Sequence, residues 1–234
     1  MTTTLIFGGT DGMGRAIADK LVADGGKVHV TSRSSEKIAS SGFPGTVCDV
    51  FNESDIESAV EEAGSQLTGL VFAVGSIVLK PLKALGAKDF IDTFMLNAVS
   101  AAMAAKKASP TLKANRGAIL FFSTVAVGRG FANHSAISAA KGAVEGITRS
   151  LAAELAPDVR VNCLSPSLTN TNLATSMTSN AAMAAALAKM HPLGRLGLTE
   201  DFGPAGAFLV SQSSSWITGQ VIGIDGGRGA LAGK

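Results

Sequence analysis

A glycine-rich turn near the N-terminus limits the fold of this 234-residue chain more than any other feature. Gly8, Gly12 and Gly14 lie between the apolar run 4–7 and the segment 15–26, whose apolar residues have helical spacing. Glycine lets the backbone turn tightly and approach a phosphate closely, and the N-terminus of the following helix supplies N–H donors. The turn therefore predicts a nucleotide-binding βαβ unit, although glycine-rich turns also serve packing alone.

Short apolar runs continue to alternate with helical segments along the rest of the chain. Further strands are expected at 27–31, 46–50, within 67–75, 118–123, 159–164 and 221–224, and helices at 54–63, 90–114 and 135–155. Strands separated by helices of this length form right-handed βαβ units in a parallel sheet that helices cover on both faces. We therefore predict one α/β domain over residues 1–234, a Rossmann-like doubly wound parallel sheet of about seven strands.

The composition excludes several classes of function. The net charge is +2 and no basic run is present, so nothing predicts binding to nucleic acid or to an anionic membrane. No apolar stretch is long enough to span a bilayer, and the N-terminus lacks the basic region of a signal peptide. The two cysteines, Cys48 and Cys163, form no CxxC pair and lie in apolar runs. We expect buried free thiols, no metal site and a cytoplasmic location.

The end of the second strand indicates which nicotinamide cofactor is preferred. A free adenosine ribose is usually held by an acidic side chain at this position, and none is present. Ser32 and Arg33 stand there instead, and the Arg33 guanidinium can bind a 2′-phosphate through two hydrogen bonds. We therefore expect NADP(H) to be preferred over NAD(H). The alternative is a solvated loop arginine, and Asp11 weakens the positive field.

Residues 5–227 resemble the short-chain dehydrogenase/reductase family in the order of their motifs. The glycine turn matches, Asp49 matches the acid that contacts adenine, and Asn97 matches the helix asparagine of the catalytic tetrad. Later signatures match at 160–162, 166, 171, 218–220 and 225–227. The resemblance implies a Rossmann-like oxidoreductase that uses a nicotinamide cofactor on a small-molecule substrate.

The resemblance also implies a set of cofactor-binding residues. Two of them depart from the family pattern, since Ala73 stands for an asparagine and Ser167 for a glycine. Thr171 is at the position that contacts the nicotinamide amide. The implied set is Gly8, Thr10, Gly12, Met13, Gly14, Ser32, Arg33, Asp49, Val50, Ala73, Val74, Gly75, Lys141, Pro166, Ser167, Leu168 and Thr171.

The catalytic stretch departs from the family at its most important position. The family's tetrad is Asn, Ser, Tyr and Lys, with the tyrosine four residues before the lysine that holds the nicotinamide ribose. Lys141 matches the lysine, but Ile137 occupies the tyrosine position, and the chain contains no tyrosine. Thr124 aligns with the serine and keeps its hydroxyl. Ser123 takes that role only if the following loop is one residue shorter.

Three interpretations of the missing tyrosine stay open. His134 lies seven residues before Lys141, the place of the tyrosine in some enoyl reductases of the superfamily, and a histidine can donate a proton near neutral pH. The alternative for His134 is a loop histidine that only bonds backbone or water. Ser138, three residues before Lys141, would orient substrate or water. In the third interpretation the chain binds NADP(H) but catalyses little, as a sensor, a scaffold or a subunit of a hetero-oligomer.

The segment 171–198 corresponds to the family's substrate-binding lid. It is rich in alanine and methionine and has few charges, so a small, mostly uncharged substrate is expected. Met177, Met183 and Met190 suit an adaptable apolar pocket, and His191 is expected to be structural. The sequence therefore predicts an NADPH-dependent reductase of a carbonyl or a conjugated C=C bond.

The helix expected at 135–155 predicts self-association. It is crowded with alanine and glycine, and its outer faces are scarcely charged. Small residues let helices approach closely, and a weakly polar outer face indicates contact with another subunit. Family members are commonly cytosolic dimers or tetramers, so we expect a homodimer or a homotetramer.

Overall fold

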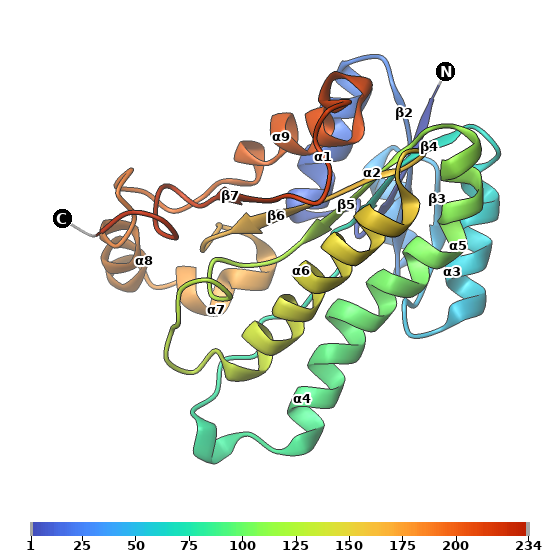
Figure 1. Cartoon of the computed structure of the whole chain (residues 1–234). Coiled ribbons are helices and arrows are strands. Elements are labelled where there is room, and N and C mark those ends of the chain that lie inside the picture. Colours follow the sequence, from blue (N-terminus) through green and yellow to red (C-terminus); the bar gives the residue numbers. More distant parts are fainter. Residues whose placement is uncertain (1, 233–234) are drawn as a thin grey trace.

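The computed structural model describes residues 2–232 and contains one seven-stranded sheet (Figure 1). All strand pairs are parallel, and the order across the sheet is β3-β2-β1-β4-β5-β6-β7. The winding direction reverses between β1 and β4, which confirms the predicted doubly wound α/β fold. The strands are β1 (Thr3–Phe7), β2 (Lys27–Ser32), β3 (Gly45–Val47), β4 (Leu67–Phe72), β5 (Ala118–Phe122), β6 (Arg160–Pro166) and β7 (Val221–Ile224).

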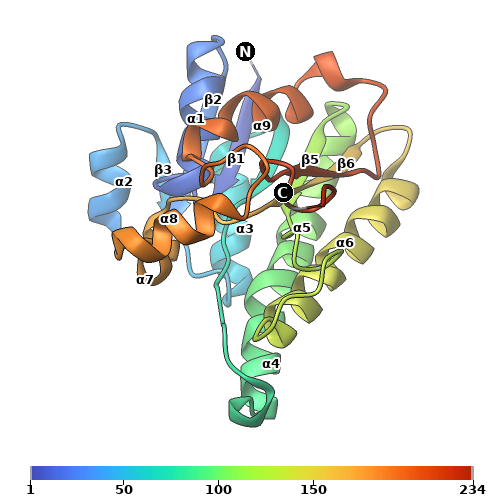
Figure 2. The same cartoon turned by 90° about the vertical axis from the view of Figure 1, so that its left-hand side faces the viewer.

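Helices cover both faces of the sheet, so each face has its own hydrophobic core (Figures 1 and 2). Successive side chains of β1 alternate between the two cores, with Leu5 and Phe7 in one and Ile6 in the other. Among residues 2–232, no helix is both long and apolar enough to cross a membrane. One face carries α1 (Gly12–Ala23) and α9 (Gly203–Val210), and the other carries α3 (Glu53–Ala63), α5 (Ser100–Ala114) and α6 (Ser135–Leu155).

The region around the second and third strands differs from the prediction. The third strand was expected at 46–50 but ends at Val47, because β3 lies at the sheet edge and pairs only with β2. The polar loop expected after the second strand contains a short helix, α2 (Ser35–Ser41). Ser34 caps this helix by accepting a hydrogen bond from Lys37 N at 3.2 Å. Helix α2 buries almost none of its residues, so its sequence is polar and lacks the apolar spacing from which a helix is predicted.

The helix expected at 90–114 is present but is not a regular α-helix throughout. It consists of α4 (Ala87–Phe94), the π-helical turn η2 (Met95–Val99) and α5. Such turns are rare, and many occur at functional sites. Here the turn carries Asn97, which is buried. No residue pattern in the sequence distinguishes this turn from a regular helix.

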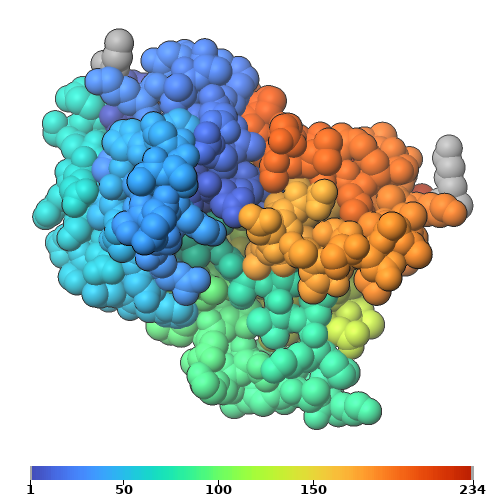
Figure 3. Space-filling model, turned by 180° about the vertical axis from the view of Figure 1, so that it is seen from behind, coloured from blue at the N-terminus to red at the C-terminus, as the bar shows by residue number. Residues whose placement is uncertain are grey.

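The lid segment lies beside the N-terminal half of the chain. Figure 3 shows the lid in orange next to the blue atoms of the first fifty residues. It contains η3 (Asn172–Ala174), α7 (Thr175–Thr178) and α8 (Ala181–Lys189). No residue of α8 is buried, although the helix consists of alanine, methionine, leucine and one lysine. About half of the surface of Met183 and of Met190 is exposed, so these methionines do not belong to the core.

Candidate active site

A cleft of about 300 Å³ opens at the carboxyl ends of β1 to β4. Ligands of doubly wound sheets bind at this edge, next to the point where the strand order reverses. The structure brings together residues that are up to 165 positions apart in the sequence, from Gly8 to Leu173. Most of the predicted cofactor-binding residues line the cleft, namely Gly8, Thr10, Gly12, Met13, Ser32, Arg33, Asp49, Val50, Ala73, Val74, Gly75 and Thr171.

Close contacts explain two glycines of the N-terminal turn. A β-carbon on Gly14 would lie 2.4 Å from Gly8 O, so no other residue lets α1 start so close to the turn. Gly8 itself has a φ of +77°, which L side chains rarely adopt. Gly14 therefore serves the packing of α1, and it does not contribute to the described lining of the cleft.

Asp11 connects the glycine turn to the lid. It is the N-cap of α1, where its Oδ1 accepts a hydrogen bond from Gly12 N at 2.7 Å. Its Oδ2 accepts a second hydrogen bond from Asn172 Nδ2 at 2.6 Å and lies 3.9 Å from Lys37 Nζ. A carboxylate thus stands at the helix N-terminus that the sequence predicts as a phosphate site, and both of its oxygens have partners.

Arg33 supplies positive charge to the outer end of the cleft. It follows β2, is exposed, and forms no hydrogen bond or ion pair with another residue of the described range 2–232. The acids that line the described part of the cleft are Asp11 in the glycine turn and Asp49 after β3. The end of β2 therefore presents a guanidinium and no carboxylate.

Asn97 and Lys141 converge on Gly75 at the inner end of the cleft. A β-carbon on Gly75 would lie 2.8 Å from Asn97 Oδ1 and 3.4 Å from Lys141 Nζ. Asn97 is held in the π-helical turn by a hydrogen bond from its Nδ2 to Thr93 O at 2.9 Å. It also donates to Ser76 Oγ at 3.2 Å. Glycine at position 75 thus leaves both polar groups next to the cleft.

The amine of Lys141 is buried without a compensating carboxylate. No ion pair or hydrogen bond joins its Nζ to another residue of the described part of the chain. Burial lowers the pKa of Lys141 from its ordinary value of 10.5 to about 8, and the neighbouring Cys163 has a smaller effect in the opposite direction. Burial also raises the pKa of Cys163 to about 12, so this thiol stays protonated and unreactive.

The two hydroxyls after β5 have different partners. Ser123 is buried, and its Oγ donates a hydrogen bond to Glu145 Oε1 of α6 at 2.7 Å. Thr124 is partly buried, and its Oγ1 accepts a hydrogen bond from Ala126 N at 3.3 Å. The hydroxyl proton of Ser123 is therefore used in a hydrogen bond inside the protein. Thr124 Oγ1 is an acceptor in its bond with Ala126 N, so this bond does not use the hydroxyl proton of Thr124.

His134 lies just outside α6. His134 is the N-cap residue of α6, and its carbonyl accepts a hydrogen bond from Ser138 N at 2.8 Å. His134 Nδ1 lies 2.7 Å from Ala132 O, and the ring packs edge-on against Phe131 with centroids 5.4 Å apart. These contacts occupy one nitrogen of the imidazole and hold the ring in the loop.

The first turn of α6 offers no other free proton donor next to Lys141. Ser138 Oγ donates a hydrogen bond to Ala126 O at 3.0 Å and so ties the helix to the loop after β5. Ile137, one turn before Lys141, is only 4% exposed. An apolar side chain therefore occupies the place from which the family resemblance expects a proton.

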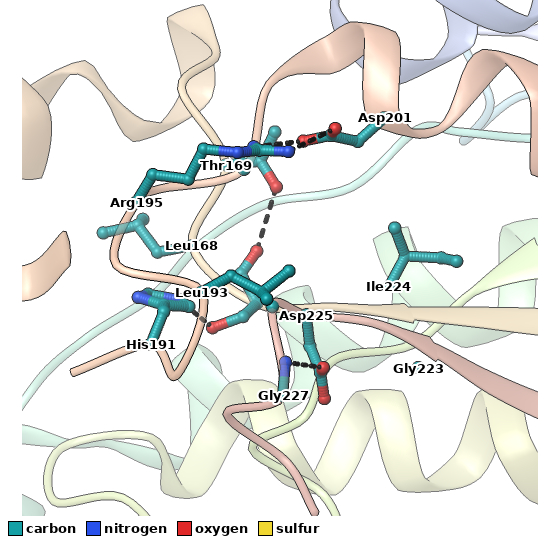
Figure 4. Close-up of a pocket in the computed structure, with 13 residues that line it drawn as sticks. Leu168, Thr169, His191, Leu193, Arg195, Asp201, Gly223, Ile224, Asp225 and Gly227 are labelled. Carbon is teal, nitrogen blue, oxygen red and sulfur yellow. Dashed lines mark hydrogen bonds and ion pairs between the residues drawn. The ribbon is translucent and has the colours of Figure 1, made fainter. Parts of the chain in front are cut away.

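Two residues predicted to bind the cofactor line another cavity. It measures about 340 Å³ and lies at the ends of β6 and β7 (Figure 4). Ser167 and Leu168 contribute to it, and Ser167 Oγ lies 2.8 Å from His191 Nε2. His191 is buried, and its Nδ1 lies 2.9 Å from Leu187 O, so both ring nitrogens have partners. Pro166 is buried at the end of β6 and accepts a hydrogen bond from Val125 N at 3.0 Å.

Sequence reasoning missed several residues of the cleft. Most stand one position from a predicted site residue, and that adjacency is the signal that could have found them. Among residues 2–232, no group of three or more His, Cys, Asp or Glu side chains could hold a metal ion. The missed residues are Asp11, Thr31, Cys48, Phe51, Leu96, Asn172 and Leu173.

Comparisons with known proteins agree with this architecture. A family model described as enoyl-(acyl carrier protein) reductase matches residues 8–228. A tropinone reductase homologue of Arabidopsis thaliana is 36% identical over 240 residues, which cover 96% of this chain and 91% of the relative. The solved structure of levodione reductase has a TM-score of 0.93 at 27% identity, covering 99% of this chain and 98% of that chain. A short-chain type dehydrogenase/reductase from Mycobacterium ulcerans has a TM-score of 0.92 at 28% identity, covering 99% and 91%. The chain belongs to the short-chain dehydrogenase/reductase family.

Proposed function

We propose that this protein is an NADPH-dependent reductase that acts on a carbonyl or a conjugated C=C bond of a small, mostly uncharged substrate. The main support is the convergence of Asn97 and Lys141 on Gly75, at the inner end of a cleft that begins at the glycine turn. The proposal includes both C=O and C=C bonds as the bond that is reduced. The matching family model is described as an enoyl reductase, whereas the names of similar proteins include tropinone reductase and levodione reductase.

The residues of the cleft fit a phosphorylated dinucleotide. Gly8 and Gly12 line the cleft without a side chain, and the N-terminus of α1 follows them, so a diphosphate could approach the backbone of the turn closely. Arg33 would hold a 2′-phosphate, since it is exposed and the end of β2 has no acid to hold a free ribose. When it is bound, the nicotinamide supplies the hydride.

The residues at the inner end of the cleft have distinct roles in this proposal. Lys141 donates hydrogen bonds to the cofactor's ribose, because its amine lacks an internal partner. Thr124 orients the substrate oxygen through the hydroxyl proton that the protein does not use. Ile137 has no proton to give, so the wild type reduces its substrate slowly, with the proton taken from water or from the substrate. His134 is the alternative donor, through Nε2, because its Nδ1 lies 2.7 Å from Ala132 O.

A second candidate function is binding of NADP(H) without efficient catalysis, in a sensor, a scaffold or a subunit of a hetero-oligomer. The burial of Ile137 favours this second function. The chain contains no tyrosine, and a buried isoleucine occupies the tyrosine position of the family. The loss of a general acid lowers the rate by roughly 10²–10⁴-fold, and cofactor binding does not need that acid.

A screen of NADPH oxidation against ketones, quinones and enones separates the two functions. The Asn97→Ala variant is the control, since it loosens the π-helical turn and keeps the cofactor cleft. We expect turnover in the wild type that exceeds the turnover of this variant. Equal rates in both, with NADPH still bound in a calorimetric titration, would favour the binding protein.

The cofactor preference gives a separate prediction. NADPH should bind roughly 10- to 100-fold more tightly than NADH, the range of charge-assisted hydrogen bonds, and Arg33→Asp should reverse the order. Arg116→Asp is the matched control, because this substitution makes the same charge change at an exposed residue in the turn before β5. Isothermal titration gives the four affinities. Equal affinities in the wild type, or an unchanged preference in Arg33→Asp, would contradict the NADPH assignment.

The proposal includes assembly into a homodimer or a homotetramer in the cytoplasm. The outer face of α6 exposes Ala139 and Gly146, and neighbouring α4 exposes Ile91 and Phe94. A second copy of the chain would cover these apolar groups. The two buried free thiols suit a reducing compartment. Light scattering should give at least twice the monomer mass of 23.6 kDa, and a monomer at micromolar concentration would refute the assembly.

A further inference from the structure

An exposed aromatic ring stands at the outer end of the cofactor cleft. Phe51 follows β3 and is 55% exposed, although burial of a large apolar side chain is favourable. Phe94 and Phe208 are exposed to a similar degree, 44% and 42%, but neither lines the cleft. Phe51 thus combines exposure with a place in the ligand cleft.

The backbone of Phe51 is fixed before any ligand arrives. Its N–H donates a hydrogen bond to Asp49 Oδ1 at 3.1 Å, and Asn52 N donates to Asp49 O at 2.9 Å. Asn52 then caps α3 by accepting a hydrogen bond from Ser54 N at 3.1 Å. The ring is therefore carried by a short, hydrogen-bonded turn between β3 and α3 and not by a loose loop.

The groups around Phe51 suit a purine that carries an anionic sugar. Val50 is buried beside it, and Ser32 and the Arg33 guanidinium lie at the neighbouring strand end of the same cleft. Asp49 uses Oδ1 for the turn, and within residues 2–232 no hydrogen bond reaches its Oδ2. The free carboxylate oxygen of Asp49 can accept a hydrogen bond from an exocyclic amino group. The Phe51 ring can face a base, and the Arg33 guanidinium can bind a phosphate.

We propose that Phe51 is a base-stacking residue that receives one face of the adenine ring of the cofactor. This inference rests on the proposed binding of NADPH and adds a residue that determines affinity for the adenosine half. Stacking on an aromatic residue contributes substantially to binding of a base and is insensitive to the cofactor's redox state. Phe51 should therefore act equally on oxidised and reduced cofactor.

Fragments of the cofactor test the inference without any turnover. Adenosine 2′,5′-bisphosphate carries the base and the phosphates, and reduced nicotinamide mononucleotide carries only the other half. Phe51→Ala should weaken NADPH and the adenosine fragment by the same factor, roughly 5- to 100-fold, and leave the nicotinamide fragment unchanged. Phe208→Ala, the matched control, should leave all three affinities unchanged.

A fluorescent reporter tests for stacking itself. The chain has one tryptophan, Trp216, which is 99% exposed, so Trp216→Phe combined with Phe51→Trp places the only indole at the cleft. Saturating adenosine 2′,5′-bisphosphate should quench this indole, because a stacked base lies against its face. The wild type, whose Trp216 is not among the residues that line the cleft, should keep its emission.

The outcomes separate the two proposals. A wild type that binds neither NADPH nor the adenosine fragment overturns the proposed function and this inference together. A wild type that binds both, with affinities unchanged in Phe51→Ala, overturns the inference alone. A loss that extends to the nicotinamide fragment also overturns it, because the change then acts on the whole cleft. Loss confined to the adenosine side, with quenching of the Phe51→Trp reporter, establishes the stacking role.

Discussion

Lys141→Met should raise the free energy of unfolding of the cofactor-free protein by about 3 kcal/mol at pH 7. The native fold holds the pKa of Lys141 at about 8, against an ordinary value of 10.5, because the ammonium is buried without a carboxylate partner. One unit of pKa corresponds to about 1.4 kcal/mol of preference for the neutral form. Methionine fills a similar volume and has no charge to desolvate, so it removes this penalty.

The pH dependence has a definite sign. Between pH 8 and 10.5 the unfolded chain keeps the Lys141 proton while the native protein has lost it, so the unfolded state binds more protons. Stability from this group therefore rises as the pH increases through that window, and the full penalty is present below pH 8. Lys141→Met should lack this rise.

Urea unfolding of the wild type and two variants between pH 7 and 10.5 measures the effect. Lys106→Met is the matched control, since Lys106 is an exposed lysine on α5. The difference between the wild type and Lys141→Met should shrink as the pH rises, whereas Lys106→Met should follow the wild type. A Lys141→Met protein that is less stable than the wild type at pH 7 would show that the amine has a favourable internal partner.

Ile137→Tyr should increase ketone reduction at least ~10²-fold, the low end for a restored general acid. The new hydroxyl would lie one helical turn before Lys141 and near Thr124 and Asn97, the other members of the family's tetrad. Ile137 is only 4% exposed, so a larger side chain at this position enters the protein interior. We therefore expect the larger ring to lower stability by about 1–3 kcal/mol through overpacking.

Ile137→Phe is the control that separates packing from proton donation, because it adds the same ring without the hydroxyl. Steady-state NADPH oxidation with a diketone should rise in Ile137→Tyr and stay at the wild-type level in Ile137→Phe. Adding His134→Ala should leave the gain intact. The hypothesis that Ile137 limits the activity is wrong if the wild type is already active and His134→Ala reduces that activity by ~10²-fold or more.

The parallel sheet was predictable because its strands are buried on both faces and appear as continuous apolar runs between helices. The run 118–122, AILFF, is buried at every position and was found without ambiguity. Elements with little burial were missed, as the polar helix α2 shows. The π-helical turn was also missed, because its hydrogen-bond shift depends on packing around Asn97 and not on composition.

The candidate site was predictable where single residues define the backbone or carry charge. Gly8, Arg33 and Asp49 were found because strand ends place them at one edge of the sheet. Side-chain direction was not predictable. The sequence left Ser123 and Thr124 as alternatives, and only the hydrogen bond from Ser123 to Glu145 shows which hydroxyl is committed inside the protein.

The hydrogen bond between Asp11 and Asn172 has a consequence for ligand affinities under the proposed function. Asp11 belongs to the turn that we propose as the diphosphate site, and Asn172 belongs to the segment 171–198 that we propose as the substrate lid. A cofactor that breaks this bond frees the lid, and a substrate that pulls the lid away frees the turn. Equilibrium coupling is reciprocal, so each ligand then improves the affinity of the other by the same factor. The affinities for the two proposed ligands are thereby linked through a single side-chain contact.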